Sequence, residues 1–394
     1  MYRMAFWSTG CERRTRCVVR IAVLAYAIAC LNGCGRSDSA SGVATDLADC
    51  QAQSIRLVEL LDDASGFADL VTAVDSIRLE STEESFLASA SAVHRHPGGF
   101  VVVDERADKA LLFAQDGSFV AKFGVQGDGP AEYRGLRDGQ VRPNGNVLLL
   151  ALLSQELLEF APDGRFIREL PLRDLGIRPD EMRLVGDDST EWLLFHDLDG
   201  SQDGPAAGSK IIVAELTDDG LRYDRSFGTP EPLLQRLGFR MASFGVQADG
   251  RIWVSKVFEL ETEIFEAGGE PWRIADSPTD VLPGPHLTPE MFERFDRPSA
   301  ASTTYNAATR AFKFVFASLF VAVSYYAGAR DEAYLLFYSN CGELLRPYFR
   351  SDSFPLFYAV RGTWGDTLAA IREAVSPDAP GDAANPTLLL YRIK

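Results

Sequence analysis

Two histidines at alternate positions, His94 and His96, are the first candidates for metal chemistry. Alternate residues of a β-strand point to the same face, so both imidazoles would face one way, and imidazole is a common metal ligand. The Pro97-Gly98-Gly99 turn follows directly, and His196 and His286 are too distant to complete a motif. The sequence has no Cys/His zinc spacing and no DxDxDG calcium loop. We therefore interpret the pair as exposed residues at a strand end, with metal binding as the alternative, and we expect no cofactor.

A glycine-rich segment from Phe123 to Tyr133 reads FGVQGDGPAEY. A phosphate-binding loop would continue into a helix and carry a lysine, and both features are missing here. We predict instead an irregular link between two β-sheets, in which Glu132 and Tyr133 either lock the sheets together or present a binding edge. The candidate binding residues of this loop are Gln126, Asp128, Glu132, Tyr133 and Arg134.

The charge balance excludes some partner classes. The 394 residues include 39 Lys+Arg and 56 Asp+Glu, which gives a formal charge of −17. This negative charge argues against electrostatic binding of nucleic acid over a broad surface. Acidic pairs such as Asp187-Asp188 and Asp218-Asp219 fall in predicted turns, where solvated aspartates are common. Because no constellation of nucleophile, base or paired carboxylates is found, we predict no catalytic residue.

A recurring hairpin motif predicts the fold. FAQDGSF at residues 113–119 recurs as FAPDGRF at 160–166, and looser copies begin at Leu216, Phe265 and Tyr338. Each Asp-Gly-like pair supplies the positive φ of a tight hairpin turn. A second series of turns lies at 97–99, 144–145, 188–189, 249–250 and 365–366, and a sixth is expected near 309–319. Two hairpins in each unit of about 45–70 residues make four-stranded units, so we predict an all-β, six-bladed β-propeller.

The last blade is predicted to be shared between the two ends of the propeller, which we place at residues 71–394. The apolar run at 387–393 lacks a partner strand, and the run at 74–79 lacks a blade. Pairing the two closes the ring with the N-terminal strand and removes two exposed sheet edges.

The first 33 residues have the pattern of an export signal. Five arginines precede or flank an uncharged run from Ile21 to Leu31. Eleven residues rise only about 16 Å as a helix, which is too short for a hydrocarbon core of about 30 Å. Cleavage after Gly33 would remove five arginines and one glutamate and change the formal charge from −17 to −21. Cys50 and Cys341 would then be the two unmodified cysteines, and they could pair in an oxidising compartment.

Two motifs resemble those of known bacterial proteins. Leu31-Asn32-Gly33-Cys34 resembles the lipobox of bacterial lipoproteins, which implies acylation of Cys34; an ordinary secretory signal is the alternative. The segment from Phe123 to Tyr133 resembles the iGxxGxGPGEy motif of bacterial lipoproteins of the six-bladed, NHL-like β-propeller family, with Ala131 where that family usually has glycine. The resemblance implies that residues 1–33 are a lipoprotein signal peptide and that residues 34–70 are an acylated N-terminus and flexible tether. It also implies that the protein is attached to the membrane of the cell envelope, on its periplasmic or surface face.

The lengths of the connections favour one face of the predicted ring. Turns between first and second and between third and fourth strands are short, and we name their side the tight-turn face. Links between second and third strands and between blades are longer, as at 125–136 and 273–301, and form the long-loop face. Loops on a rigid scaffold carry most binding residues. We therefore expect a non-catalytic propeller that binds a protein, peptide or glycan through the long-loop face.

The alternative function is a metal-dependent hydrolase of the lactonase-like propeller type. It needs a divalent ion held by carboxylates and amides that converge on the central channel. Three or more inward Asp, Glu or Asn side chains would favour the enzyme, and an apolar or arginine-filled channel would favour the binding protein.

Overall fold

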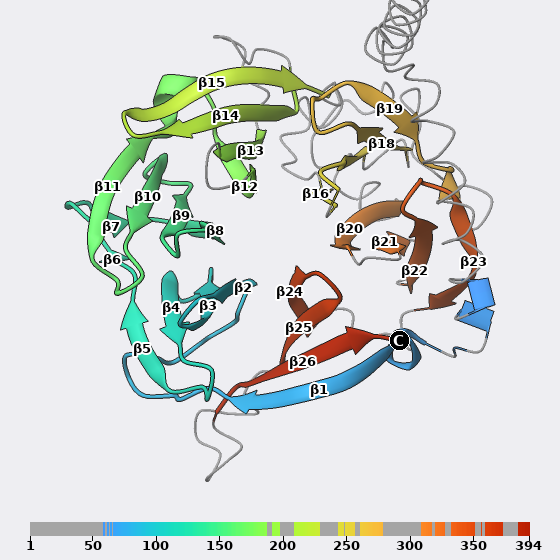
Figure 1. Cartoon of the computed structure of the whole chain (residues 1–394), viewed down its shortest axis with the longest axis horizontal. Coiled ribbons are helices and arrows are strands. Elements are labelled where there is room, and N and C mark those ends of the chain that lie inside the picture. The colour runs from blue at the N-terminus through green and yellow to red at the C-terminus, as the bar shows by residue number, and fades with distance from the viewer. Residues whose placement is uncertain are drawn as a thin grey trace, which may run out of the picture. The chain divides into compact units, whose positions relative to one another are not determined.

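The computed structural model describes residues 58–59, 61–62, 64, 66–186, 191–197, 209–228, 243–247, 249–256, 261–278, 309–316, 320–327, 332–350, 356, 359–372 and 385–394. Within the unit that begins at Gln53, six four-stranded antiparallel sheets are arranged as the blades of a ring (Figure 1). The predicted all-β, six-bladed propeller of four-stranded blades is confirmed. None of the helices in these ranges is long and apolar enough to span a membrane.

The strands follow one another around the ring in sequence order. Blade 1 is β2 (Ala92–His96), β3 (Gly99–Asp104), β4 (Lys109–Phe113) and β5 (Phe119–Lys122), and blade 2 is β8 (Leu136–Val141), β9 (Val147–Ala151), β10 (Glu156–Phe160) and β11 (Phe166–Pro171). Blade 3 is β12 (Pro179–Gly186), β13 (Glu191–Asp197), β14 (Ile211–Thr217) and β15 (Gly220–Phe227). Blade 4 is β16 (Ser243–Val246), β17 (Ile252–Lys256), β18 (Glu261–Phe265) and β19 (Pro271–Ile274). Blade 5 is β20 (Thr309–Phe316), β21 (Phe320–Ala327), β22 (Glu332–Ser339) and β23 (Leu344–Arg350).

Blade 6 joins the two ends of the ring. It consists of β24 (Val360–Trp364), β25 (Thr367–Arg372), β26 (Thr387–Ile393) and β1 (Val71–Arg78), with β1 outermost and paired to β26. Val71 pairs with Ile393 and Arg78 with Thr387, with a bulge between Ala73 and Asp75. The predicted closure by an N-terminal strand is therefore confirmed.

The folded region begins earlier than the sequence pattern indicates. Leu61, Phe67 and Leu70 are completely buried, the last two in the 3₁₀ turn η1 (Phe67–Leu70). They pack against side chains of blades 5 and 6, and the Phe67 ring stacks on Phe337 with centroids 6.5 Å apart. The expectation of a flexible tether up to residue 70 is therefore corrected for these residues, because their apolar side chains cover the seam between two blades.

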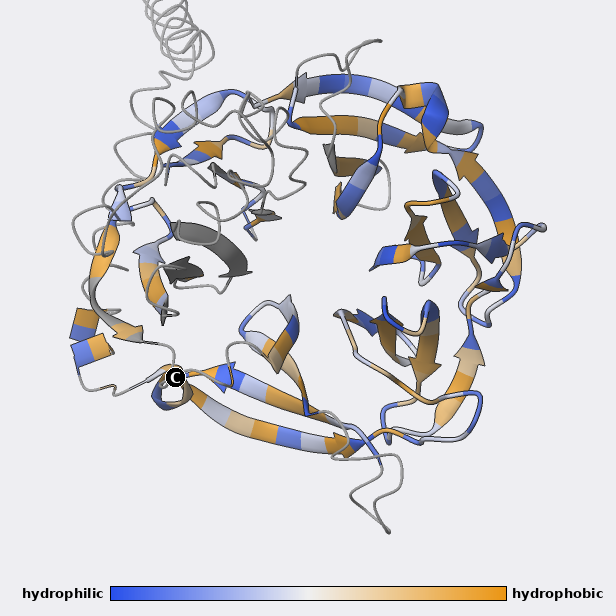
Figure 2. Ribbon diagram, turned by 180° about the vertical axis from the view of Figure 1, so that it is seen from behind, coloured by the Kyte–Doolittle hydropathy of each residue, from blue (hydrophilic) through white to orange (hydrophobic). Residues whose placement is uncertain are grey.

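Burial follows the position of a strand within its blade. Every residue of β3 and β9 is buried, since both faces of a middle strand pack against other blades. Outer strands are covered on fewer sides and alternate between half-buried and exposed residues, as in β15. Figure 2 shows the contrast in blade 3, where β14 is mostly hydrophobic and β15 mostly hydrophilic. The core thus consists of layers between adjacent blades.

Candidate functional site

The glycine-rich loop forms a small structure of its own between blades 1 and 2. β6 (Val125–Gln126) and β7 (Glu132–Tyr133) pair in parallel at the outer rim of the ring (Figure 1). The backbone N–H of Gly127 donates to the carbonyl of Tyr133 at 3.0 Å, and that of Glu132 donates to Gly129 at 2.9 Å. The loop leaves β5 and enters β8, so it crosses between blades on the long-loop face.

Glu132 holds the loop together from inside. Its Oε2 accepts a hydrogen bond from the N–H of Gly129 at 2.8 Å. A Cβ atom added to Gly127 would lie 1.9 Å from the same oxygen, so only glycine allows this approach. The carboxylate of Glu132 is therefore occupied by its own loop.

Tyr133 anchors the loop in the core. Its side chain is completely buried and packs in the cluster shared by blades 1 and 2, with Phe123, Leu136 and Val103 among its members. Burial raises the pKa of the Tyr133 phenol above its ordinary value, so the group stays neutral. This side chain fixes the position of the loop and presents no surface to solvent.

The other three predicted residues are exposed. Gln126, Asp128 and Arg134 lie on the surface, and the Asp128 carboxylate accepts from the Arg134 guanidinium in an ion pair. Leu153 extends this surface, since its N–H donates to the carbonyl of Arg134 at 3.1 Å and its side chain is 68% exposed. Val125 is 43% exposed. We name residues 125–134 together with Leu153 the loop platform.

Ala131 explains how the loop departs from the glycine-rich motif. Its φ is +64°, a left-handed conformation that strains a residue with a side chain. The backbone therefore keeps the turn that glycine favours elsewhere. We expect Ala131→Gly to raise the free energy of unfolding slightly, by about 0–1 kcal/mol, because relief of strain exceeds the added entropy of the unfolded chain. Denaturant unfolding measures the change, and a loss of stability would contradict it.

A chain of contacts connects the inner strands of four successive blades, which surround the centre of the ring in Figure 1. Nε2 of His94 in β2 lies 4.0 Å from Oδ1 of Asp138 in β8. Oδ2 of Asp138 accepts from Nη1 of Arg183 in β12 at 2.9 Å. The Arg183 guanidinium lies over the Phe244 ring of β16, 5.5 Å from its centroid. The carboxylate of Asp138 is thus paired with an arginine.

His94 is neutral in this chain of contacts. Burial lowers its pKa to about 4, and the Arg183 charge adds to that shift, whereas the Asp138 charge opposes it. Arg183 also donates to Oε1 of Glu181 at 2.7 Å. Across the described residues, no group of three or more His, Cys, Asp or Glu side chains is placed to hold a metal ion.

His96 corrects the expectation of exposed strand-end histidines, because it is only 2% exposed. Its Nε2 lies 2.9 Å from the carbonyl of Gly145 in the β8–β9 turn, and its Nδ1 accepts from the N–H of Gly98 at 2.9 Å. A carbonyl only accepts, so Nε2 carries the proton. Both ring nitrogens are therefore used, and the ring joins the tight turns of blades 1 and 2.

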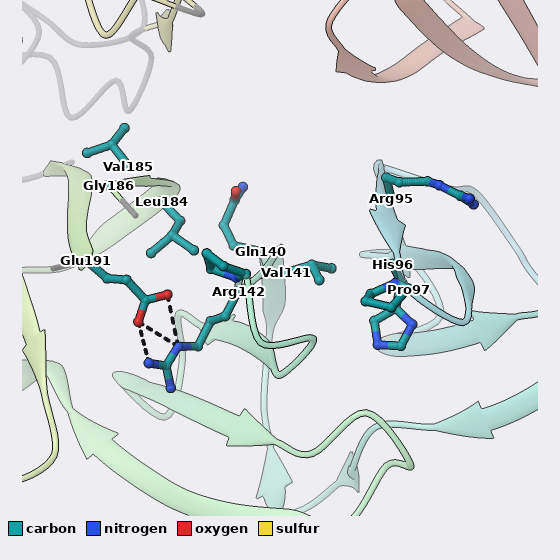
Figure 3. Close-up of a pocket in the computed structure, with 11 residues that line it drawn as sticks. Arg95, His96, Pro97, Gln140, Val141, Arg142, Leu184, Val185, Gly186 and Glu191 are labelled. Carbon is teal, nitrogen blue, oxygen red and sulfur yellow. Dashed lines mark hydrogen bonds and ion pairs between the residues drawn. The ribbon is translucent and has the colours of Figure 1, made fainter. Parts of the chain in front are cut away.

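A pocket of about 490 Å³ lies on the tight-turn face between the inner strands of blades 1 to 3. Its walls include Pro97, Val141 and Leu184, and Figure 3 shows Val141 between the Arg142 side chain and the His96–Pro97 turn. Arg142 donates to Glu191 through Nε at 2.9 Å. Two charged groups of this pocket, Arg142 and Glu191, thus bond to each other.

Behind the pocket, a buried ion network joins blades 2 and 3. Glu159 is 1% exposed and accepts from Arg142, from Asn146 at 2.7 Å and from Arg168 at 2.7 Å. Arg168 also reaches the carbonyl of Thr217 in blade 3 at 2.7 Å. Burial alone would raise the pKa of Glu159, but the hydrogen bonds from Asn146, Arg168 and Arg142 outweigh it and hold the pKa below its ordinary value. The sequence signal for this network is a glutamate inside the otherwise apolar segment ELLEF at 156–160, which the sequence analysis does not identify.

The cysteines are described only in part. Cys341, in the β22–β23 turn, is completely buried and disulfide-bonded. Cys34 and Cys50 lie outside the described residues.

Comparison with known proteins supports the fold. Residues 51–203 match the model of a family described as 6-bladed beta-propeller, DUF5128. The crystal structure of a "Putative exported protein" from Bacteroides fragilis NCTC 9343 is similar with a TM-score of 0.60 and 14% identity, covering 84% of this chain and 97% of that one. A member of the DUF4221 family from Bacteroides vulgatus has a TM-score of 0.55 and 11% identity, covering 82% of this chain and 98% of that one. No curated protein matches the sequence.

Proposed function

We propose that this six-bladed propeller is an exported, non-catalytic binding protein that is anchored to the cell envelope through a lipid on Cys34. Its N-terminal sequence supports export, through the arginine-rich start, the short apolar run and the Leu31-Asn32-Gly33-Cys34 motif. The similar structure of a "Putative exported protein" is consistent with that location.

The loop platform is the observation that carries the binding function. It is rigid, because Tyr133 is buried and Glu132 bonds within the loop. It also presents exposed aliphatic side chains, Val125 and Leu153, beside an exposed ion pair. Preorganised loops that expose apolar and charged groups together are typical of binding surfaces. Among the proteins, peptides and glycans expected as partners, aliphatic side chains favour a protein or peptide.

The inner strands support binding over hydrolysis. A lactonase-like site needs several carboxylates free to hold a divalent ion. In the described strands, Asp138 and Glu181 are instead occupied by Arg183. If the purified chain hydrolysed lactones in the presence of a divalent metal ion, the alternative function as a hydrolase would replace this proposal.

Photocrosslinking in cells tests the proposed surface. A photoreactive amino acid at Gln126 is expected to form a defined adduct with an envelope component, because this exposed position lies in the loop platform. The same residue at Asp366, an exposed position in the β24–β25 turn of blade 6, is the control. Adducts from Asp366 alone, or none from either position, would contradict the proposal.

A charge exchange gives the specificity control. The double variant Asp128→Arg and Arg134→Asp retains an exposed ion pair, so its stability should change by less than about 1 kcal/mol, while the adduct from Gln126 should be lost.

The variant Cys34→Ser separates membrane attachment from partner binding. It should release the protein from membranes and leave binding by the purified domain unchanged.

A further inference from the structure

The pocket on the tight-turn face has walls that are held in place by bonds within the protein. Both ring nitrogens of His96 are bonded, to Gly98 and to Gly145, and Arg142 is bonded to Glu191. The volume of about 490 Å³ lies within the range of about 300–1,000 Å³ that is typical of ligand sites. Because the walls are already ordered, a ligand that enters the pocket pays little for ordering them.

The charges at the floor of the pocket are neutralised within the protein. Arg142 donates to Glu191 through Nε and Nη2 and to Glu159 through Nη1. Glu159 also accepts from Arg168, so two arginines face two carboxylates. A charged ligand would have to displace one of these partners or remain unpaired in a partly buried site, and either outcome costs free energy. The floor therefore favours an uncharged ligand.

Arg95 also contributes to the wall, but its charge is directed elsewhere. Its guanidinium lies 5.0 Å from the centroid of the Phe100 ring, and its Nη1 donates to the carbonyl of Gly99 at 3.0 Å. Figure 3 shows the Arg95 side chain turned away from Gln140. The part of the pocket beside Gln140 therefore remains without a net charge.

Gln140 offers the pocket an unused hydrogen-bonding pair. Its Nε2 donates to the carbonyl of Met182 at 3.2 Å, which uses one of the two hydrogens on that nitrogen. In the part of the chain that the structure describes, no group donates to Oε1 of Gln140. A side-chain amide with a free acceptor and a second N–H matches a peptide unit, which has one donor and one acceptor. Gln140 can therefore pair with a peptide backbone through two hydrogen bonds.

The remaining walls are aliphatic. Val141 and Leu184 are half-buried, and Pro97 and Pro143 are exposed at the rim (Figure 3). Such walls bury an aliphatic side chain favourably. The flat face of a sugar ring lacks a flat aromatic partner here, since the described residues that line the pocket include no Phe, Tyr or Trp. Among uncharged ligands, the walls thus favour a peptide over a glycan.

We propose that this pocket is a second binding site, which takes an uncharged peptide segment whose aliphatic side chain packs between Val141 and Leu184 and whose backbone amide pairs with Gln140. The site is separate from the loop platform, because the pocket lies at the inner strands on the tight-turn face and the platform lies at the outer rim.

Photolabelling of the full chain tests the site. The probe is N-acetyl-photoleucine methylamide, an uncharged peptide mimic whose aliphatic side chain carries a diazirine. It should attach saturably to residues 140–143 or 184–186, as located by mass spectrometry of the digested protein. Labelling that does not saturate, or that occurs only outside the pocket, would overturn the proposal.

Competition on the unmodified chain tests the chemical class of the ligand. N-acetyl-leucine methylamide should displace the probe, whereas the corresponding lysine and glutamate derivatives and methyl glucoside should not. Equal displacement by a charged derivative would contradict the neutral floor. Displacement by methyl glucoside alone would replace the peptide with a glycan.

The variant Gln140→Met tests the amide pairing. Methionine has a similar length but cannot pair with a peptide unit, so the competitor should bind about tenfold more weakly. The control Gln126→Met makes the same change in the loop platform and should leave the affinity unchanged. Equal affinities for the Gln140 variant and the control would show that the amide has no role in binding. If the Gln140 variant does not fold, the photolabelling and competition results on the unmodified chain decide.

Discussion

Replacement of Glu159 by alanine is expected to lower the free energy of unfolding by about 3–5 kcal/mol, which is the usual result of removing one partner from a buried ion network. Glu159 is 1% exposed, and its loss leaves the partly buried guanidinium groups of Arg142 and Arg168 without their shared carboxylate. Denaturant unfolding of the purified domain measures the difference. Because the pKa of Glu159 is held low in the folded protein, its contribution is present at neutral pH and is lost as the pH falls through that value.

A surface ion pair provides the matched control. Glu215 accepts from Arg222, whose side chain is 70% exposed. Glu215→Ala should therefore cost no more than about 1 kcal/mol. Equal costs for the two alanine variants would show that the buried network adds nothing beyond an exposed pair. Glu159→Gln should lie between them, since an amide oxygen still accepts from Asn146.

Deletion of residues 387–394 is expected to abolish cooperative folding. The deletion removes β26, which lies between β25 and β1, so both neighbours lose their hydrogen-bonding partner. It also removes Leu388, which is completely buried in the cluster shared by blades 6 and 1. The combined loss is expected to exceed a typical domain stability of about 5–15 kcal/mol.

Thermal unfolding and solubility of the deleted chain measure this effect. The control Arg392→Ala changes an exposed side chain of the same strand and should alter stability by less than about 0.5 kcal/mol. A deleted chain that remains soluble with an unchanged melting temperature would show that the ring does not depend on β26.

Much of the architecture could be predicted because it depends on local sequence. Turn pairs such as Asp116-Gly117 and Asp163-Gly164 need positive φ at glycine, and both glycines have it, at +88° and +87°. Tight turns separated by apolar runs define hairpins, and the hairpins set the number of blades. The apolar segments at 309–316 and 320–327 likewise form an antiparallel pair, β20 and β21.

Contacts between blades could not be predicted in the same way. Arg142 and Glu191 are 49 positions apart, and nothing in their local sequence indicates that their turns meet. The burial of His96 depends on Gly145 at a similar separation. For the loop platform, sequence indicated the segment but not the division of roles, in which Tyr133 is buried and Leu153, from another hairpin, is exposed beside Arg134.

The pairing of β1 with β26 also sets the order in which the chain can complete its fold. Val71 finds its partner only when Ile393 is present, near the end of 394 residues. At about 5–20 residues per second, synthesis of the chain takes roughly 20–80 s, during which β1 has no partner strand. Contacts between such distant segments also form slowly. The ring therefore stays open until β26 has been synthesised, and the blade that contains the first strand is the last to be completed.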